Sequence, residues 1–96
     1  MMKHTLIALG LLVALASPAS AACYADYKAK RGNPLKLHYG VVELPDTACG
    51  SVDAAAAQIA SRIGRDGWVL LNVISIFENS GLEQRKDNAG DYFLRY

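Results

Sequence analysis

Residues 68–77 form an almost unbroken apolar run, in which only Asn72 and Ser75 are polar. Successive side chains of a strand point to opposite faces, so both faces of this segment would be apolar. One face would carry Trp68, Leu70, Ile74 and Ile76, and the other Val69, Leu71, Val73 and Phe77. A strand of this kind is typical of the middle of a sheet that is covered on both sides. The run therefore predicts a central strand.

Two segments with weaker alternation precede this run. Apolar and polar residues alternate over residues 24–31 and, more clearly, over residues 35–41. The apolar positions of the second segment are Leu35, Leu37, Tyr39 and Val41. The sequence Gly-Asn-Pro at residues 32–34 lies between the two segments and is typical of a turn. We expect the two segments to form a β-hairpin.

An amphipathic helix is predicted between the hairpin and the apolar run. Ser51 is a good N-cap residue, and Asp53 lies in the first turn, where the helix dipole favours a carboxylate. The apolar stripe of this helix consists of Val52, Ala56, Ile59 and Ile63. Gly64 or Gly67 is expected to end it.

The C-terminal region supplies the last predicted elements. Residues 78–90 form a polar connection with room for a short strand at residues 82–85, and the alternation at residues 92–96 predicts a final strand. The predicted fold is therefore α+β: a mostly antiparallel four-stranded sheet with one amphipathic helix on one face, in the order β-β-α-β-β.

One short helix can cover only one face of such a sheet. The other face would keep the candidate interface residues Val69, Leu71, Val73 and Phe77. An exposed apolar patch of more than a few hundred Å² usually marks an interface. We expect this face to contact a second copy of the chain in a homodimer, an envelope protein partner, or the 78–90 segment folded back over it.

The first 21 residues have the features of a signal peptide. Lys3 and His4 give a basic start, an apolar run follows at residues 6–16, and residues 19–21 form an Ala-x-Ala cleavage signature. The run is shorter than the about 20 residues that span a bilayer. We therefore predict a cleaved signal peptide at 1–21 and a single small α+β domain at 22–96, without a transmembrane segment in the mature chain. The protein would be periplasmic or secreted.

Two cysteines, Cys23 and Cys49, remain after this cleavage. An even number of cysteines in an oxidising compartment predicts a disulfide bond between them. A lipidated Cys23 is the alternative, but bacterial lipoprotein signals generally place a leucine three positions earlier, where this chain has Ser20. The spacing is not Cys-x-x-Cys, so a thioredoxin-like redox role has little support.

The charges of residues 22–96 balance, because removal of Lys3 leaves nine basic against nine acidic residues. A neutral domain lacks the basic surface that nucleic-acid binding normally needs. The one local concentration of charge is a candidate basic patch of Lys28, Lys30, Arg31 and Lys36. The patch would meet an anionic partner, such as a lipid head group or an acidic protein, or would only protect an edge hairpin from aggregation.

No recognisable catalytic motif follows from the sequence. His38 is the single histidine of residues 22–96, and its position beside Lys36 predicts an exposed side chain on the polar side of its strand. A histidine-built metal site is therefore not expected, and neither a cofactor nor a catalytic Ser-His-Asp set is predicted.

These observations favour an exported, non-enzymatic binding module that acts through an apolar sheet face and self-associates. The alternative is a small-ligand-binding protein, or an enzyme with an unrecognised site, that uses a cleft between helix and sheet. The candidate cleft residues are Trp68, Tyr27 and Tyr92. For Trp68 the competing interpretation is a side chain that seals one end of the core.

Residues 59–96 resemble a small bacterial family known as domain of unknown function 4177. The likeness rests on helix positions Ile59 and Ile63, on the sequence Gly-Trp-Val-Leu at residues 67–70, and on the aromatic and basic residues at 92–96. Val69 stands where the family usually has glutamate, and the cysteine pair and the longer 32–50 region also depart from its pattern. The resemblance implies the same α+β fold and no particular activity.

Overall fold

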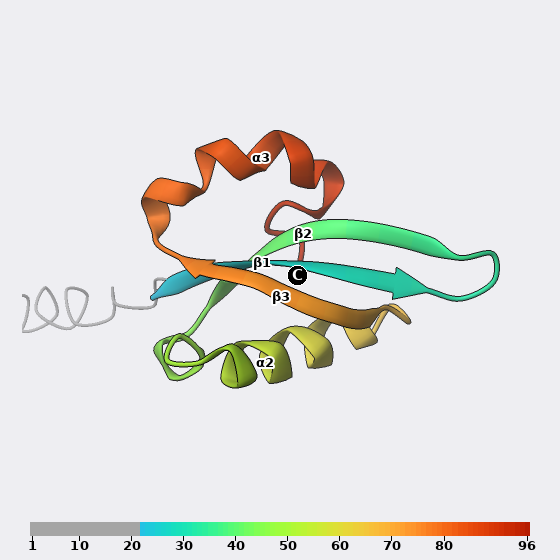
Figure 1. The fold of residues 1–96 in the computed structure, drawn as a ribbon, viewed down its shortest axis with the longest axis horizontal. Helices are drawn as coiled ribbons and strands as arrows, with labels where there is room; N and C mark the ends of the chain where they lie inside the picture. Colours follow the sequence, from blue (N-terminus) through green and yellow to red (C-terminus); the bar gives the residue numbers. More distant parts are fainter. Residues whose placement is uncertain (1–21) are drawn as a thin grey trace, which may run out of the picture.

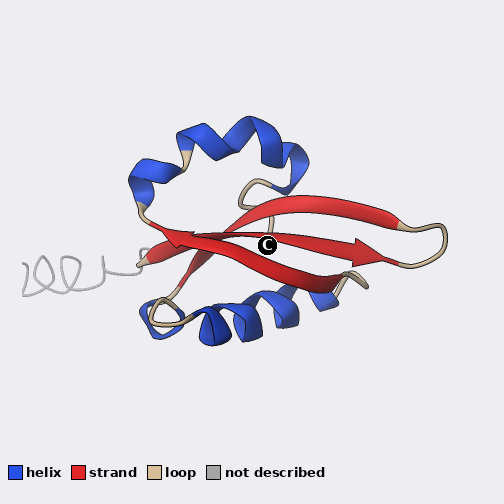
Figure 2. Cartoon of the chain, viewed as in Figure 1, coloured by secondary structure: helices blue, strands red, loops and turns tan. Residues whose placement is uncertain are grey.

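Residues 22–96 are the part of the chain that the computed structural model describes, and they form a three-stranded antiparallel sheet with a helix on each side (Figures 1 and 2). The strands are β1 (Cys23–Arg31), β2 (Lys36–Leu44) and β3 (Val69–Phe77), in the order β2-β1-β3. The predicted signal peptide, residues 1–21, lies outside the described residues. Within residues 22–96, no helix has the length and apolar character needed to cross a membrane.

The two helices are α2 (Val52–Gly64) and α3 (Glu83–Ala89). Short 3-10 helices occupy Asp46–Ala48, Asn79–Gly81 and Gly90–Tyr92. The α+β class and the antiparallel sheet are confirmed, but the sheet has three strands rather than four, and there are two helices rather than one. The segment at 82–85 is not a strand, because Leu82 is the N-cap residue of α3 and the rest of the segment lies in its first turn.

The predicted C-terminal strand at residues 92–96 does not form. Phe93 makes only an isolated parallel bridge to Val41, and the backbone N–H of Leu94 donates to the Val41 carbonyl at 2.8 Å. Leu94 itself has φ 57°, a left-handed conformation that interrupts an extended strand. This segment therefore caps the outer edge of β2 instead of extending the sheet.

The apolar strand β3 lies at an edge of the sheet, and the prediction of a central strand there is wrong. The centre is β1, which pairs with β2 on one side and with β3 on the other. Ala25, Tyr27 and Ala29 of β1 are fully buried. These buried residues alternate with polar ones, as expected for a strand with one side toward the main core. The small side chains of Ala25 and Ala29 leave room for α2 to approach the sheet.

Helix α2 begins and ends as the sequence predicts. The Ser51 hydroxyl accepts a hydrogen bond from the Ala54 N–H at 3.0 Å, and the chain turns out of the helix at Gly67, which has φ 82°. The buried stripe differs from the predicted one. It consists of Ala55, Ile59 and Ile63, whereas Val52 is 54% exposed.

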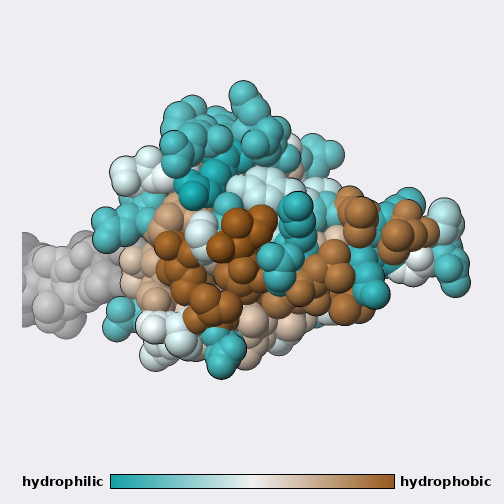
Figure 3. Space-filling model, in the orientation of Figure 1, coloured by the Kyte–Doolittle hydropathy of each residue, from teal (hydrophilic) through white to brown (hydrophobic). Residues whose placement is uncertain are grey.

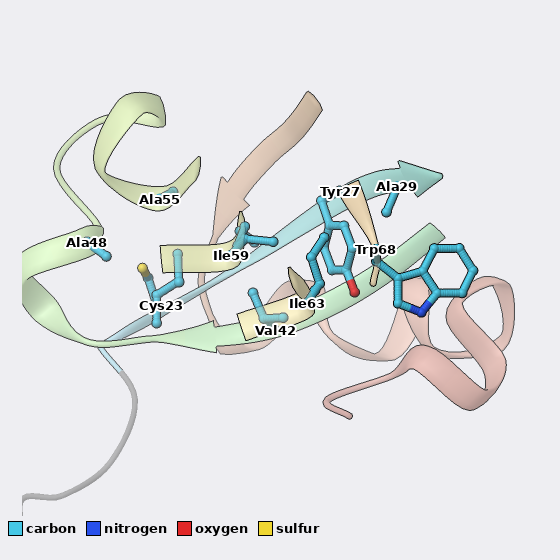
Figure 4. Packing of buried hydrophobic residues seen from close by; sticks show 11 residues of the cluster. Cys23, Tyr27, Ala29, Val42, Ala48, Ala55, Ile59, Ile63 and Trp68 are labelled. Atoms are coloured by element: carbon cyan, nitrogen blue, oxygen red, sulfur yellow. The ribbon is translucent and has the colours of Figure 1, made fainter. Parts of the chain in front are cut away.

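The main core lies between α2 and the sheet (Figure 4). On β2 the residues that face this core are those paired with the buried side chains of β1, which places Val42 opposite Ala25 and Leu44 opposite Cys23. Leu37 points to the other face of the sheet and is 65% exposed. The expected exposure of His38 is therefore wrong, because its side chain lies on the core side and is only 8% exposed.

The predicted disulfide between Cys23 and Cys49 is confirmed, with a Cα–Cα distance of 6.1 Å. It joins the start of β1 to the segment just before α2 and closes a loop of sequence separation 26. The bond thus ties the central strand to the helix that covers it.

We expect the double variant Cys23→Ser/Cys49→Ser to lose about 3 kcal/mol of unfolding free energy, because the loop closed by the disulfide no longer restricts the unfolded chain. Urea denaturation of the variant and of the wild type, each with and without a reductant, measures the difference. The reductant should lower the wild-type midpoint to that of the variant and leave the variant unchanged. Equal midpoints for oxidised wild type and variant would contradict the prediction.

Candidate functional site

The sheet face opposite α2 is covered over only part of its area. Helix α3 and the segments beside it lie over this face (Figure 1), and beneath them Val41 is fully buried and Asp26 is 4% exposed. Of the three expected ways to cover this face, the folded-back C-terminal segment accounts for the part around Asp26. The part toward the β1–β2 turn stays open.

A buried carboxylate holds α3 to the sheet. Asp26 accepts hydrogen bonds from the Ser75 hydroxyl at 2.7 Å, the Tyr39 hydroxyl at 2.8 Å and the Arg85 Nε at 3.0 Å. Burial by itself raises the pKa of Asp26, but these three hydrogen bonds and the charge of Arg85 outweigh it, and the pKa lies below its usual value of 3.8. Burial and the nearby carboxylate raise the pKa of Tyr39 to about 12.

This network was not predicted from the sequence. Asp26 and Arg85 are 59 residues apart; Asp26 occupies a polar position of an alternating strand and Arg85 lies in a polar segment, so both resemble solvated residues. Their only sequence signal is the position of Asp26 between two buried β1 residues, Ala25 and Tyr27. The network is satisfied internally, so its evident role is to fix α3.

The open part of this face contains a shallow depression of about 310 Å³. It is lined by Lys28, Ala29, Leu37, His38, Tyr39 and Leu71. Its side chains are mainly apolar, and Lys28 contributes the one charged group. The depression is open to solvent and belongs to the surface rather than to the core.

The candidate interface residues do not share one face, because β3 carries two irregularities in its pairing with β1. The register shifts skip Leu71 and Ile74, which are 48% and 46% exposed. Val73 packs against the main core, and Phe77 lies beneath the Arg85 guanidinium at 3.9 Å. The exposed apolar surface along β3 therefore comes from Val69, Leu71 and Ile74. In Figure 3, which has the orientation of Figure 1, apolar surface lies at the centre of the view.

The four residues of the candidate basic patch lie near the β1–β2 turn but differ in their contacts. Lys28, Lys30 and Lys36 are exposed and form no ion pair within the described residues. Arg31 is half-buried, donates to the Asp66 carbonyl at 3.0 Å and lies 4.2 Å from the centre of the Trp68 ring. The free positive charge therefore belongs to the three lysines.

The candidate cleft residues Tyr27, Trp68 and Tyr92 do come together, around His38. The His38 ring stacks on Tyr92 at 3.7 Å between centroids, meets Trp68 edge-on at 4.3 Å, and shares a hydrogen bond of 2.8 Å between its Nε2 and the Tyr27 hydroxyl. Trp68 is 4% exposed, and its place in the core matches the core-sealing interpretation. The imidazole occupies the space in which a ligand was expected.

Gly40 makes this arrangement possible. A Cβ atom at this position would lie 2.5 Å from the Tyr27 hydroxyl, so only glycine lets the Tyr27 ring cross β2 and reach His38. The feature of the sequence that indicates a buried His38 is therefore Gly40, which pairs with Tyr27 on β1.

The surroundings of His38 disfavour its protonated form. Burial, together with the positive charges of Arg31 and Arg95, lowers the pKa of His38 from 6.5 to about 4. Within the described residues the Nδ1 atom has no hydrogen-bond partner, so a doubly protonated ring would bury an unpaired donor. Burial, with Tyr96 and Tyr92 nearby, also raises the pKa of the Tyr27 hydroxyl above its usual value of 10.

Residues 22–96 bring no three histidine, cysteine or acidic side chains close enough to hold a metal ion together. Comparisons with known proteins found no matching family model, no similar curated protein and no matching solved structure.

We expect the unfolding free energy to fall as the pH is lowered from 6.5 toward 4, because the unfolded chain takes up a proton on His38 that the folded chain resists. Stability from this source is fully present above the unfolded pKa and is lost as the pH falls through the folded pKa. Urea denaturation at a series of pH values measures the effect.

The matched variant for this measurement is His38→Phe, which keeps an aromatic ring against Tyr92 and cannot take up a proton. Its stability should change less between pH 6.5 and 4 than that of the wild type, whatever its absolute stability. The stabilising effect of the Asp26 carboxylate is lost mainly near and below its usual pKa of 3.8, and this loss is common to both proteins. Parallel curves for variant and wild type between pH 6.5 and 4 would rule out this role of His38.

Proposed function

We propose that this protein is an exported, non-enzymatic binding module that self-associates through the outer edge of β3. The observation that carries the proposal is the exposure of Val69, Leu71 and Ile74, at 55%, 48% and 46%, along a strand whose outer edge pairs with no strand of residues 22–96. Large apolar side chains grouped at an open strand edge are typical of a contact surface.

The two edges of the sheet differ in how far they are protected from pairing with another chain. The outer edge of β2 receives the C-terminal segment through the Leu94–Val41 hydrogen bond and the bridge at Phe93. The nine residues of β3 include no lysine, no proline and no charged residue of any kind, which are the usual means of blunting an edge. Only the register shifts that skip Leu71 and Ile74 interrupt the strand.

A second copy of the chain is the partner that this edge favours. An uncharged strand can meet its own copy across a two-fold axis without repulsion between like charges. Antiparallel contact between two β3 edges would join two three-stranded sheets, and both outer edges of the product would be β2 edges capped by their C-terminal segments. Such an association closes on itself as a dimer.

The remaining features favour binding over catalysis. The imidazole of His38 is buried and its Nε2 is engaged by Tyr27, which leaves it badly placed as a general base for an external substrate. The alternative of a ligand site or an unrecognised active site among Trp68, Tyr27 and Tyr92 has less support, because His38 occupies that space. The balanced charge of the mature chain gives no support for nucleic acid as a partner.

Export is part of the proposal and rests on the signal-like residues 1–21 together with the Cys23–Cys49 disulfide, since such bonds persist in oxidising compartments. The resemblance of residues 59–96 to domain of unknown function 4177 also belongs to the proposal. It supports a small α+β module and adds no activity.

We expect Ile74→Glu to shift the protein from dimer to monomer, because two carboxylates would face one another near the two-fold axis and the apolar contact would shrink. Light scattering coupled to gel filtration at micromolar concentrations measures the mass of each species. Since Ile74 is 46% exposed, the substituted chain should remain folded as a monomer.

Val52→Glu is the matched control, because Val52 is 54% exposed on the first turn of α2 and a carboxylate is well tolerated there. It should remain dimeric. A wild-type protein that is monomeric at every concentration tested, or equal dissociation of both variants, would refute the proposed interface.

A further inference from the structure

We propose that the tip of the β1–β2 hairpin, residues 28–37, binds the surface of a bilayer that contains anionic lipids. This site lies at the hairpin end of the sheet, where it adjoins the β3 edge at Val69 and Leu71, and it goes beyond the function proposed above. Figure 1 shows that the hairpin extends past the ends of both helices. Its turn, residues 32–35, is exposed throughout, so the tip can reach a flat surface without obstruction from the rest of the domain.

The tip carries the two most exposed large apolar side chains of the described residues. Leu35 is 66% exposed and Leu37 is 65% exposed. Nothing in residues 22–96 covers them, and neither contributes to the main core. Side chains that project from a convex turn suit insertion between lipid head groups, as in proteins that lie at a membrane interface.

The charge of the tip is uniformly positive. Lys28, Lys30, Arg31 and Lys36 all lie between Tyr27 and Val42, and this interval contains no aspartate or glutamate. The three lysines are exposed and form no ion pair within the described chain. The domain as a whole is neutral, so this segment is where its positive potential concentrates, and it is complementary to a negatively charged surface.

Basic and apolar side chains also alternate across the strands at the tip. Lys30 lies directly opposite Leu37 on β2 and opposite Val69 on β3, so the three side chains share the open face of the sheet. Lys28 and Leu71 continue this pattern around the shallow depression. A lysine between apolar neighbours can place its ammonium at the phosphate level while the apolar groups lie deeper.

The shape and the charge favour a lipid surface over other partners. A second copy docked on this face would bring its lysines against those of the first, which is unfavourable. A stable protein partner needs about 800 Å² of surface on each side, and a narrow convex tip offers less than that unless the partner wraps around it. A bilayer adapts to the tip and supplies both negative charge and an apolar layer.

The experiment measures co-sedimentation of the disulfide-bonded chain from residue 22 onward with phosphatidylcholine vesicles, with or without phosphatidylglycerol. Residues 22–96 contain the entire described core, and this chain lacks the apolar run at residues 6–16, which could itself bind lipid. Binding is expected to the phosphatidylglycerol vesicles at low salt and not to pure phosphatidylcholine. It should weaken as salt is added, because salt screens the lysines.

Two variants separate the contributions. Lys30→Gln/Lys36→Gln should weaken binding about tenfold or more, since each removes a charge near the surface. Leu35→Ser/Leu37→Ser should weaken it by about the same factor, because the apolar insertion is lost. Lys86→Gln on α3 and Val52→Ser on α2 are the matched controls, and both should bind as the wild type does.

Insertion of the tip has its own readout. In Leu35→Trp, brominated lipid should quench the added fluorescence, whereas Trp68 in the wild type is 4% exposed and should be little affected. Equal binding to neutral vesicles, equal losses in the control variants, no binding at low salt, or unquenched fluorescence in Leu35→Trp would each overturn the proposal. So would binding to polyglutamate as tight as to vesicles, which would identify an acidic polypeptide as the partner.

Discussion

The burial of β1 between β2 and β3 is the constraint on which the rest of the structure depends. Because β1 pairs on both sides, its inward side chains, Ala25, Tyr27 and Ala29, decide what each neighbouring strand must place against α2. The same alternation turns Asp26 and Lys28 to the other face. Asp26 there organises α3, and Lys28 remains free in the part that α3 does not reach.

Local signals predicted the elements better than their arrangement. The Ser51 cap, the end of α2 near Gly64, the β1–β2 hairpin and the disulfide all depend on residues close in sequence or on cysteine number, and all are present. The predicted central position of β3 is wrong, because a strand with two apolar faces can also lie at the edge of a sheet. In this chain the second face of β3 is partly exposed apolar surface, and pairing with β1 rather than composition determines the strand order.

The candidate site could be predicted only where the apolar alternation of the sequence agrees with the pairing of the strands. Trp68, Tyr27 and Tyr92 do come together, but His38 could not be placed among them, since the alternation of Leu35, Leu37 and Tyr39 suggested the opposite orientation for β2. Both sides of β2 are in fact used, because α3 buries Val41 on one face and α2 buries Val42 on the other. The second cover is α3, which lies in the segment that the sequence pattern predicts to be a polar connection.

The hydrogen bonds at Asp26 have a consequence for how this chain folds. Their donors come from β2, β3 and α3, at sequence separations of 13, 49 and 59. A helix of seven residues has little stability in isolation, so α3 must wait until the sheet presents the carboxylate to Arg85. Contacts of such high sequence separation slow folding and place the formation of α3 after that of the sheet. The helix that covers the second face of the sheet would therefore be the last element to form.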